Sequence, residues 1–365
     1  MKKDSSTAGT YYNFPYQKTL IPGVLSIHSS FKKLTGFPLC TKLEERHNCS
    51  LGHPLAPIRI VVTQQDKTTT PTPSGKEYKA GRVSTHIRTP FGRLFSLDAE
   101  FIREEGAPFT ISVNAAYKRL AKLTVGNVPS LGWLARDLAN IALLQNGYAL
   151  LHAAAFSFEG RTILIVGLSN TGKTTTALKF AKNFGASLYG DDLVATDGRQ
   201  LFACPHTALN IPPSSTPGFF AKATQIASKT IPFYENFGAE KRITIEQFIG
   251  QKSIGAPSEC TNIIFLKRSD CRKTTAVGQE TAINLLTSSN RVEFTHYDNP
   301  LINAHDYLHD QTNIRNAIET ELALITQLTS QSRKTLIEGQ PEHFESEIRK
   351  IATERQNSTP LRDNR

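Results

Sequence analysis

Apolar and polar positions alternate along the first third of the chain with the two-residue period of β-strands. The ranges 58–64, 83–89, 94–103 and 109–113 are rich in β-branched and aromatic residues and are bounded by turn-forming residues, which predicts four strands. The short spacings between the last three predict antiparallel hairpins. Residues 21–56 show no clear period. We therefore expect a small β-rich module in this part of the chain.

The period changes to that of a helix between residues 130 and 146, where leucine and alanine recur at spacings of three and four. Ser130 is a favourable N-cap, and Gly147 is a favourable C-terminal stop. This pattern predicts a helix with one apolar face. We expect Trp133, the single tryptophan, to pack in that face.

Beyond this helix, short apolar runs alternate with helical segments, which is typical of an α/β fold. The continuous apolar run at 162–166 predicts a buried central strand. The dipeptide Asp197-Gly198 predicts a tight hairpin turn. We expect strands at 150–158, 162–166, 186–189, 193–196, 201–203 and 262–266, and helices at 172–184, 313–329 and 342–355, the last of them charged and facing solvent.

Composition excludes several classes of protein. The 365 residues are 39% hydrophobic and 20% charged, which is ordinary for a globular protein and excludes disorder throughout. The length allows two domains. The patterns above divide the chain into a flexible N-terminus at 1–20, a basic β-rich module at 21–128, an α/β domain at 129–335 and a charged helical tail at 336–365.

The net charge of +10 is unevenly distributed. Residues 1–150 contain 19 Lys and Arg against 10 Asp and Glu, whereas residues 151–365 contain 23 against 22. A basic region attracts phosphates, acidic peptides or nucleic acid, although a solvated basic surface explains the same count. Residues 1–150 contain no recognisable nucleic-acid-binding signature and no interleaving of basic and aromatic residues, so nucleic acid is the weaker expectation.

Targeting signals are not recognisable in the sequence. It contains no apolar run of about 18 residues, so no membrane helix is expected, and the basic N-terminus lacks the apolar stretch of a signal peptide. An odd number of cysteines, five, predicts reduced thiols and a cytoplasmic location. The cluster of Cys40, His47, Cys49 and His53 does not have the spacing of an established zinc finger.

A glycine-rich motif follows the apolar run at 162–166. Residues 167–174, GLSNTGKT, match G-x-x-x-x-G-K-[ST] between a predicted strand and a predicted helix. The glycines allow close approach to an anion, and the backbone N–H groups of such a loop point at phosphates. The motif predicts binding of ATP with Mg²⁺. The expected binding residues are Gly167, Ser169, Asn170, Thr171, Gly172, Lys173 for the β- and γ-phosphates, Thr174 for Mg²⁺ and Thr175 for the α-phosphate.

Two acids and a histidine flank this loop in the sequence. Asp191 and Asp192 follow the short strand expected after the loop helix, and carboxyl ends of strands in an α/β sheet meet at the ligand crevice. Carboxylates there can hold Mg²⁺ or accept a proton from an attacking hydroxyl. His152 lies on the strand before the loop strand. If the two strands are parallel neighbours, His152 lies near the phosphates; otherwise it is a core histidine.

Together, the run LHAAA at 151–155, the turn at Gly160, the loop GLSNTGKTT and the doublet after Gly190 resemble the HPr kinase/phosphorylase family, which is related to the ATP-dependent phosphoenolpyruvate carboxykinases. That family places a histidine 21 residues before the loop lysine and an aspartate 18 residues after it, as His152 and Asp191 stand relative to Lys173. The resemblance covers about residues 130–204. It implies an α/β P-loop kinase core of the HPr kinase and carboxykinase type behind an N-terminal β-rich module.

The resemblance also implies roles for individual residues. Asp191 would be the general base that deprotonates a serine hydroxyl, and His152 would lie at the γ-phosphate. Asp192 would be a supporting acid that acts through the metal. The authentic HPr kinases carry a metal-binding glutamate where this chain has Thr216, 43 residues after Lys173, so HPr is not implied as the substrate. Weaker candidates are Lys241 and Arg242 for the transferring phosphoryl group, His296, His305 and His309 for a metal, and Phe219 and Phe220 for a substrate mouth.

The expected activity is ATP-dependent transfer of the γ-phosphate to a serine or other hydroxyl of a protein, a peptide or a small molecule. One alternative is a regulatory or assembly module that binds ATP without transferring phosphate. A second is a kinase directed to nucleic acid. The expected partner is an unidentified phosphoacceptor, most naturally a serine of a protein or peptide. No membrane partner is expected, and self-association into a homo-oligomer is left open.

Overall fold

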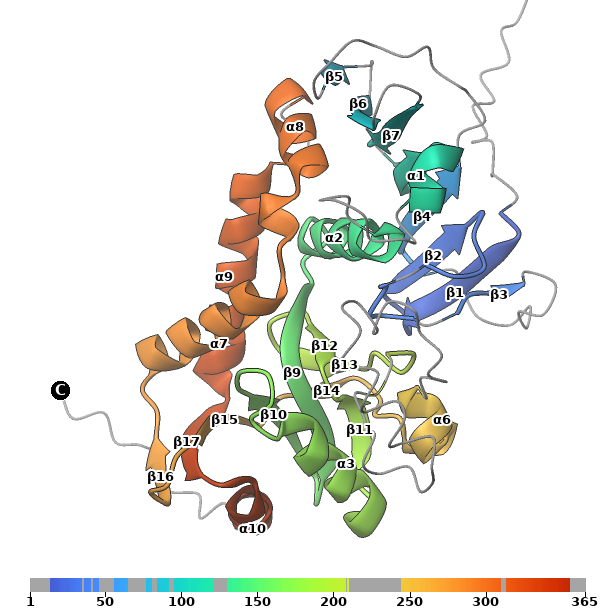
Figure 1. The fold of residues 1–365 in the computed structure, drawn as a ribbon. Helices are drawn as coiled ribbons and strands as arrows, with labels where there is room; N and C mark the ends of the chain where they lie inside the picture. Colours follow the sequence, from blue (N-terminus) through green and yellow to red (C-terminus); the bar gives the residue numbers. More distant parts are fainter. Residues whose placement is uncertain are drawn as a thin grey trace, which may run out of the picture.

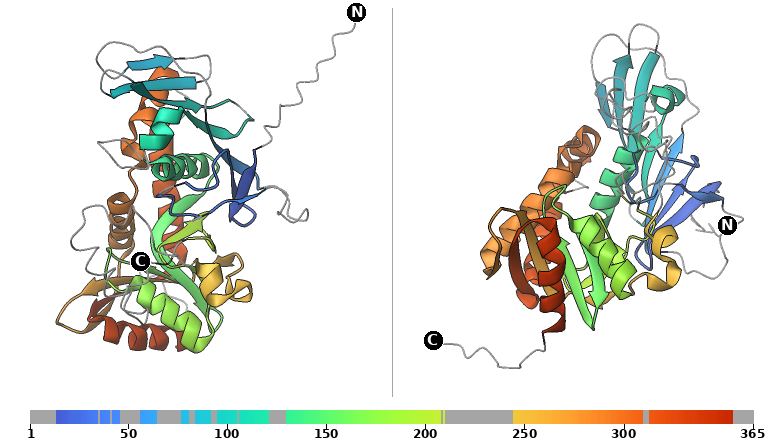
Figure 2. Two further views of the ribbon diagram at one scale, coloured as in Figure 1. Left: turned by 45° about the vertical axis from the view of Figure 1, so that its right-hand side comes forward. Right: turned by 60° about the horizontal axis from the view of Figure 1, so that its bottom comes forward.

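The computed structural model describes residues 14–34, 36–40, 42–45, 56–64, 77–80, 84–91, 95–104, 106–120, 130–207, 209, 244–309 and 313–354. These residues form a mixed α/β structure with two mixed β-sheets (Figure 1). Figure 2 shows the two sheets toward opposite ends of the molecule. In the described part of the chain, no helix has both the length and the apolar character needed to cross a membrane.

The first sheet contains eight strands among the described residues, in the order β3-β1-β2-β4-β8-β7-β6-β5. The expected hairpins are confirmed, because β6 pairs antiparallel with β7 and β7 pairs antiparallel with β8. Strand β4 pairs parallel with both β2 and β8, so the module is more than a meander. The strands are β1 (Tyr16–Ile21), β2 (Leu25–Ser29), β3 (Glu44–Glu45), β4 (Ile58–Gln64), β5 (Glu77–Ala80), β6 (Ser84–Phe91), β7 (Phe95–Ile102) and β8 (Phe109–Val113).

The second sheet follows the order β14-β13-β12-β9-β10-β15-β17-β16, and β11 pairs with β9 beside this path. Strands β10, β15 and β17 are parallel. The strands are β9 (Ala149–Phe158), β10 (Arg161–Val166), β11 (Ser187–Gly190), β12 (Leu193–Thr196), β13 (Gln200–Phe202), β14 (Ser258–Glu259), β15 (Asn262–Arg268), β16 (Lys273–Ala276) and β17 (Arg333–Gly339).

The sequence left open whether β9 is a parallel neighbour of the loop strand β10, and the structure shows that it is not. The two strands pair antiparallel as a hairpin. The two-residue turn explains the difference, because Glu159 and Gly160 both adopt positive φ, of 50° and 73°. Two such residues form the turn type that matches the twist of an antiparallel pair.

Helices cover both faces of the second sheet. On β10, Ile163 and Ile165 pack with α3 and α10, whereas Leu164 and Val166 pack with α7 and α9. This alternation explains the continuous apolar run, since both faces of the strand are buried. The helices are α1 (Ala115–Leu120), α2 (Leu131–Leu144), α3 (Lys173–Phe184), α6 (Ile245–Ile249), α7 (Gln279–Glu293), α8 (Pro300–His309), α9 (Ile314–Gln331) and α10 (Pro341–Thr353), with 3-10 turns η3 (Gln251–Ser253) and η4 (His296–Asp298).

Helix α2 joins the two halves of the molecule. It begins as expected, because the Ser130 side chain accepts a hydrogen bond from the backbone N–H of Trp133 at 3.2 Å. The helix contacts β4 and β8 of the first sheet and also β9 and α9 of the second region (Figure 1). Its leucines and alanines lie in one hydrophobic core with residues of the first sheet, so that core continues across the boundary expected at residue 128.

The expected burial of Trp133 is wrong, because half of this residue, 50%, is exposed. The smaller side chains of α2 occupy the core, and the Trp133 ring lies outside it with the Arg136 guanidinium 5.0 Å from the ring centroid. Aromatic faces attract such cations, and the indole N–H does not have to be buried in this position.

The C-terminal segment is part of the second region and is not a separate tail. The boundary expected after residue 335 falls inside β17, which pairs with β15 and β16. Helix α10 buries Phe344, Ile348 and Ile351 in the core that it shares with α3, so it does not simply face solvent. These residues recur at spacings of four and three, and the charged residues between them cover only the outer face of the helix.

Candidate functional site

The glycine-rich loop, residues 167–172, connects β10 to α3. Gly172 has a φ of 107° and Asn170 a φ of 64°, both in the region that favours glycine or asparagine. A Cβ atom at Gly167 would lie 2.8 Å from Thr171 Oγ1 and 3.0 Å from the backbone oxygen of Leu266. The glycines at both ends of the loop are therefore required by its backbone geometry.

The loop presents an uncapped helix start to solvent. Gly172 is the N-cap of α3 and has no side chain with which to bond the first N–H groups of the helix. Such groups carry partial positive charge and bind anions well. Ser169, Asn170 and Thr175 are exposed around this helix start, and Thr171 is half-buried with its hydroxyl donating to the carbonyl of Leu168 at 2.8 Å.

Lys173 is buried under the loop. Its ammonium lies 2.6 Å from the carbonyl oxygen of Gly167 and 3.2 Å from that of Leu168. It also lies 2.8 Å from Nε2 of His152 on β9. Burial lowers the pKa of Lys173, and the carboxylates of Asp192, Glu293 and Asp191 oppose this shift by favouring the charged form.

Strands β11 and β12 place the two acids beside β9. Both strands pair antiparallel with β9, and between them the backbone N–H of Ala153 donates to the carbonyl of Asp192 at 3.1 Å. Gly190 is needed at this point because a Cβ there would lie 2.0 Å from the backbone oxygen of Leu193. The acids therefore lie directly after the carboxyl end of β11, where one side of β9 changes from pairing with β11 to pairing with β12. We call this segment, residues 190–193, the strand edge.

The two acids differ in accessibility. Asp191 is fully buried at 0% exposure, whereas 28% of the Asp192 side chain is exposed. The Thr174 hydroxyl donates to the backbone oxygen of Asp191 at 3.1 Å, which ties the first turn of α3 to this strand edge. Burial raises the pKa of Asp192, and the nearby Glu293 carboxylate raises it further, while His152 and Lys173 lower it.

His152 lies at the centre of a charged cluster. Its Nε2 is 3.5 Å from Oδ1 of Asp192, and its Nδ1 is 3.3 Å from Oε2 of Glu293. The imidazole is buried, with the residue only 2% exposed. The contact with His152 lowers the pKa of the Glu293 carboxyl. The ring therefore connects a carboxylate on α7 with the lysine of the loop and the acid of the strand edge.

Glu293 is the member of this cluster that the sequence did not predict. It is the last residue of α7, far from the loop along the chain, and no local motif marks it. A second contact fixes α7 against the histidine strand, because Oδ1 of Asn290 accepts the backbone N–H of His152 at 2.9 Å. The Arg136 guanidinium donates to the backbone oxygen of Glu293 at 3.3 Å and holds the end of the helix.

The other predicted histidines lie outside this cluster. His296 is buried beside the rings of Phe294 and Tyr297, and burial lowers its pKa to about 3. His305 and His309 connect α8 to β6, where His305 Nδ1 lies 3.0 Å from the hydroxyl of Thr85. Within the described residues, no three His, Cys, Asp or Glu side chains are grouped as metal ligands. His47, Cys49, His53, Thr216, Phe219, Phe220, Lys241 and Arg242 lie outside the described residues.

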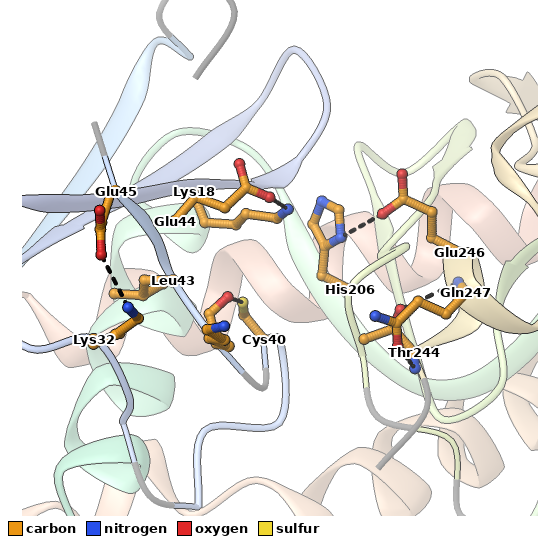
Figure 3. Close-up of a pocket in the computed structure, with 11 residues that line it drawn as sticks. Lys18, Lys32, Cys40, Leu43, Glu44, Glu45, His206, Thr244, Glu246 and Gln247 are labelled. Carbon is orange, nitrogen blue, oxygen red and sulfur yellow. Dashed lines mark hydrogen bonds and ion pairs between the residues drawn. The ribbon is translucent and has the colours of Figure 1, made fainter. Parts of the chain in front are cut away.

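A separate cavity of about 330 Å³ lies between the first sheet and the segment around α6 (Figure 3). Two of its lysines form the ion pairs Lys18–Glu44 and Lys32–Glu45, and His206 Nδ1 lies 3.1 Å from Oε2 of Glu246. Burial raises the pKa of the Cys40 thiol in this cavity to about 11, so the thiol is unreactive. None of the residues that line the cavity belongs to the glycine-rich loop or to the charged cluster.

The described residues thus define a mixed α/β protein with a glycine-rich loop beside a buried charged cluster. No protein-family model and no curated protein matches the chain. Among solved structures, it is similar to the HPr(Ser) kinase/phosphatase from Coxiella burnetii at a TM-score of 0.25 and 11% identity. This match covers 55% of the present chain and 95% of the other.

Proposed function

We propose that the protein is an ATP-dependent kinase, an α/β P-loop kinase of the HPr kinase type, that transfers the γ-phosphate to a hydroxyl group. One observation carries this proposal. The buried Lys173 ammonium lies at the glycine-rich loop within 2.8 Å of His152, beside the strand edge that holds Asp191 and Asp192. Phosphoryl transfer needs an anion-binding loop, a positive charge and a carboxylate in one place.

The loop supplies the phosphate-binding part of this function. The uncapped N–H groups at the start of α3 and the Lys173 ammonium would bind the β- and γ-phosphates of ATP. The Thr174 hydroxyl and the Asp192 carboxylate would hold Mg²⁺, and oxygen ligands of this kind suit that ion. When bound, Mg²⁺ would supply positive charge that stabilises the transferring phosphoryl group. Because Mg²⁺ usually keeps several waters, two protein ligands are sufficient.

A carboxylate of the acid pair would accept the proton of the acceptor hydroxyl. The hydroxyl oxygen forms a bond to the γ-phosphorus, the bond to the β-phosphate oxygen breaks, and ADP leaves. The resemblance to the HPr kinases assigns the base to Asp191, which is fully buried, and leaves the accessible Asp192 as the ligand for Mg²⁺. A general base must reach the proton that it takes, so the proposal requires Asp191 to become accessible when ligand binds.

The acceptor is proposed to be a serine of a cytoplasmic protein or peptide. The surplus of basic residues in 1–150 favours an acidic acceptor over a basic one. A kinase directed to nucleic acid has the same charge in its favour but has no recognition motif. A module that binds ATP without transferring phosphate is the second candidate, because a buried carboxylate pair can also be structural.

Labelled ATP tests the proposal directly. Purified wild-type protein is incubated with [γ-³²P]ATP, Mg²⁺ and a cell lysate, beside the variants Asp191→Asn, Asp192→Asn and Lys173→Ala. The control is Lys179→Ala, which changes an exposed lysine on the same helix. A labelled species that depends on Lys173 and on an acid of the pair, but not on Lys179, supports the kinase. ATP binding without any labelled species would favour the regulatory module.

A further inference from the structure

The buried imidazole of His152 lies between groups with opposite hydrogen-bonding requirements. On the Nδ1 side, the Glu293 carboxylate is the near neighbour at 3.3 Å, an ion-pair distance at which Nδ1 does not yet make a hydrogen bond in this structure. A carboxylate only accepts hydrogen bonds. On the Nε2 side, the Lys173 ammonium lies 2.8 Å away, and an ammonium only donates. A neutral imidazole has one N–H donor and one acceptor nitrogen. Of the two neutral forms, the one with hydrogen on Nδ1 suits Glu293 and Lys173, and the Asp192 carboxylate, 3.5 Å from Nε2, is a more distant neighbour than the ammonium.

We propose that Glu293 is a positioning residue of the loop site. Its carboxylate accepts a hydrogen bond from the Nδ1–H group of His152, so that the Nε2 lone pair faces the Lys173 ammonium. That lone pair holds the ammonium at the glycine-rich loop. The bond that one ring nitrogen makes sets the state of the other. Carboxylates often orient a histidine whose other ring nitrogen binds a metal. Here the other ring nitrogen contacts the Lys173 ammonium in place of a metal.

The end of α7 is held firmly enough for this role. Arg136 donates to the backbone oxygen of Glu293, and Asn290 accepts the backbone N–H of His152 at 2.9 Å. The Asn290 amide also donates to the carbonyl of Leu150 and to the carboxylate of Glu321. These contacts fix the backbone positions from which the Glu293 carboxylate and the His152 ring extend. The lowered pKa of Glu293, caused first by its contact with His152, agrees with a charged acceptor at this position.

The arrangement also explains why a lysine can be buried at the loop. Besides the imidazole, the Lys173 ammonium has two carbonyl oxygens of the loop as acceptors, so its three hydrogens each have a partner. If the imidazole carried its hydrogen on Nε2, one of these partners would become a second donor. The ammonium would then turn away from the position in which it can meet a phosphate.

The tautomer is measured by two-dimensional ¹H–¹⁵N NMR of histidine side chains, at a pH well above the ordinary histidine pKa. His152 is identified among the ten histidines as the signal missing from His152→Gln. In wild-type protein we expect hydrogen on Nδ1 of His152. Hydrogen on Nε2 in wild-type protein would overturn the proposal without any need for a variant at Glu293.

Three variants separate positioning from mere packing. Glu293→Ala removes the acceptor and should move the hydrogen of His152 to Nε2. Glu293→Gln keeps an acceptor oxygen and should retain the wild-type tautomer. Glu280→Ala makes the same truncation at an exposed acid in the first turn of α7 and should change nothing at His152. An unchanged His152 tautomer in folded Glu293→Ala would contradict the proposal.

The effect on phosphate binding is measured by calorimetric titration with Mg·ATP. Loss of a group that orients a binding residue typically costs 10- to 100-fold, so Glu293→Ala should bind ATP roughly tenfold more weakly. Glu293→Gln should stay within about twofold of wild type, and so should Glu280→Ala. An equal loss in the alanine and glutamine variants would show that charge alone matters and would overturn the role of the hydrogen bond.

The importance of this role for catalysis rests on the proposed kinase function, but different results would contradict the kinase function and the positioning role of Glu293. If no acceptor is ever labelled while the tautomer and the ATP affinities are as expected, the kinase proposal fails and the role of Glu293 stands. If phosphate is transferred but His152 carries its hydrogen on Nε2, the kinase proposal stands and the proposed role of Glu293 fails.

Discussion

The two sheets of this protein use charge in different ways. The segment that contains the first sheet carries most of the net positive charge, since residues 1–150 have 19 basic and 10 acidic side chains. The second region is almost neutral, yet it contains the glycine-rich loop with its uncapped helix start and one buried lysine. Affinity for a phosphate is therefore expected where backbone N–H groups converge, and net charge alone does not locate the site.

The largest expected effect tests whether the two regions are independent. Leu138→Ala truncates a fully buried side chain of α2, which packs against both sheets. We expect a loss of about 4 kcal/mol in the free energy of unfolding, because a cavity remains in the shared core. Urea unfolding followed by far-UV circular dichroism measures it, and Leu285→Ala, an exposed leucine of α7, is the control. Two separate transitions in wild-type protein would contradict a shared core.

The second prediction concerns the source of phosphate affinity. Lys173→Ala should weaken binding of Mg·ATP roughly 100-fold, about 3 kcal/mol, because a charge-assisted contact to phosphate is lost. Lys179→Ala removes an exposed lysine of the same helix and should leave affinity within about twofold. Calorimetric titration measures both. Equal losses in the two variants would mean that the general positive charge, and not the loop, attracts the nucleotide.

The third prediction concerns the pH dependence of the contact between α8 and the first sheet. Burial lowers the pKa of His305 to about 4, the charges of His309 and Arg103 lower it further, and Asp306 opposes them. In the unfolded chain the pKa is about 6.5, so between these values the unfolded state binds the proton and the folded state does not. Stability should therefore fall as the pH falls from about 6.5 to about 4, by about 3 kcal/mol for this residue.

Unfolding free energies measured over this pH range check the effect, and His305→Gln should flatten the dependence. His206 contributes in the same direction from the other side of the molecule, because burial lowers its pKa to about 4 as well. The double variant His206→Gln, His305→Gln should be flatter than either single variant. If no histidine variant changes the pH dependence of stability, carboxylates and not these histidines cause that dependence.

The smallest effect is expected at the surface of α2. Trp133 is half exposed, and its ring packs near Gly36 and Arg136. Trp133→Ala should lower the free energy of unfolding by about 1 kcal/mol, since an exposed cation–π contact contributes little. Trp133→Phe, which keeps a ring, should recover most of this. A loss comparable with that of Leu138→Ala would show that Trp133 belongs to the shared core after all.

The sequence predicted the elements whose signals are local. The glycine-rich loop, the hairpin at 193–203 and the strand at 262–268 follow from turn residues and short apolar runs. The turn at Glu159-Gly160 was recognisable too, but its consequence, an antiparallel β9–β10 pair, was missed. His152 still lies beside Lys173, because β9 runs past the end of β10 and reaches the loop from the other direction.

Features that depend on distant partners could not be predicted in this way. Trp133 was expected inside because an apolar residue on an apolar helix is usually buried, but the space on both faces of α2 is taken by smaller residues. The charges of α10 concealed its buried face. Glu293 reaches His152 only because α7 packs along β9, and no spacing within the sequence records that contact.

The edge that β11 and β12 form along β9 has a consequence for the order of events in turnover. Cross-strand hydrogen bonds open rarely compared with those of exposed loops, and the Ala153 amide is bonded to Asp192 within such an edge. The backbone on the carboxylate side of the site is therefore expected to open less often than the glycine-rich loop. If the protein binds a phosphate compound as proposed, the exposed loop residues 168–170 would set the rate at which it enters and leaves, and their amides should exchange with deuterium much faster than that of Ala153.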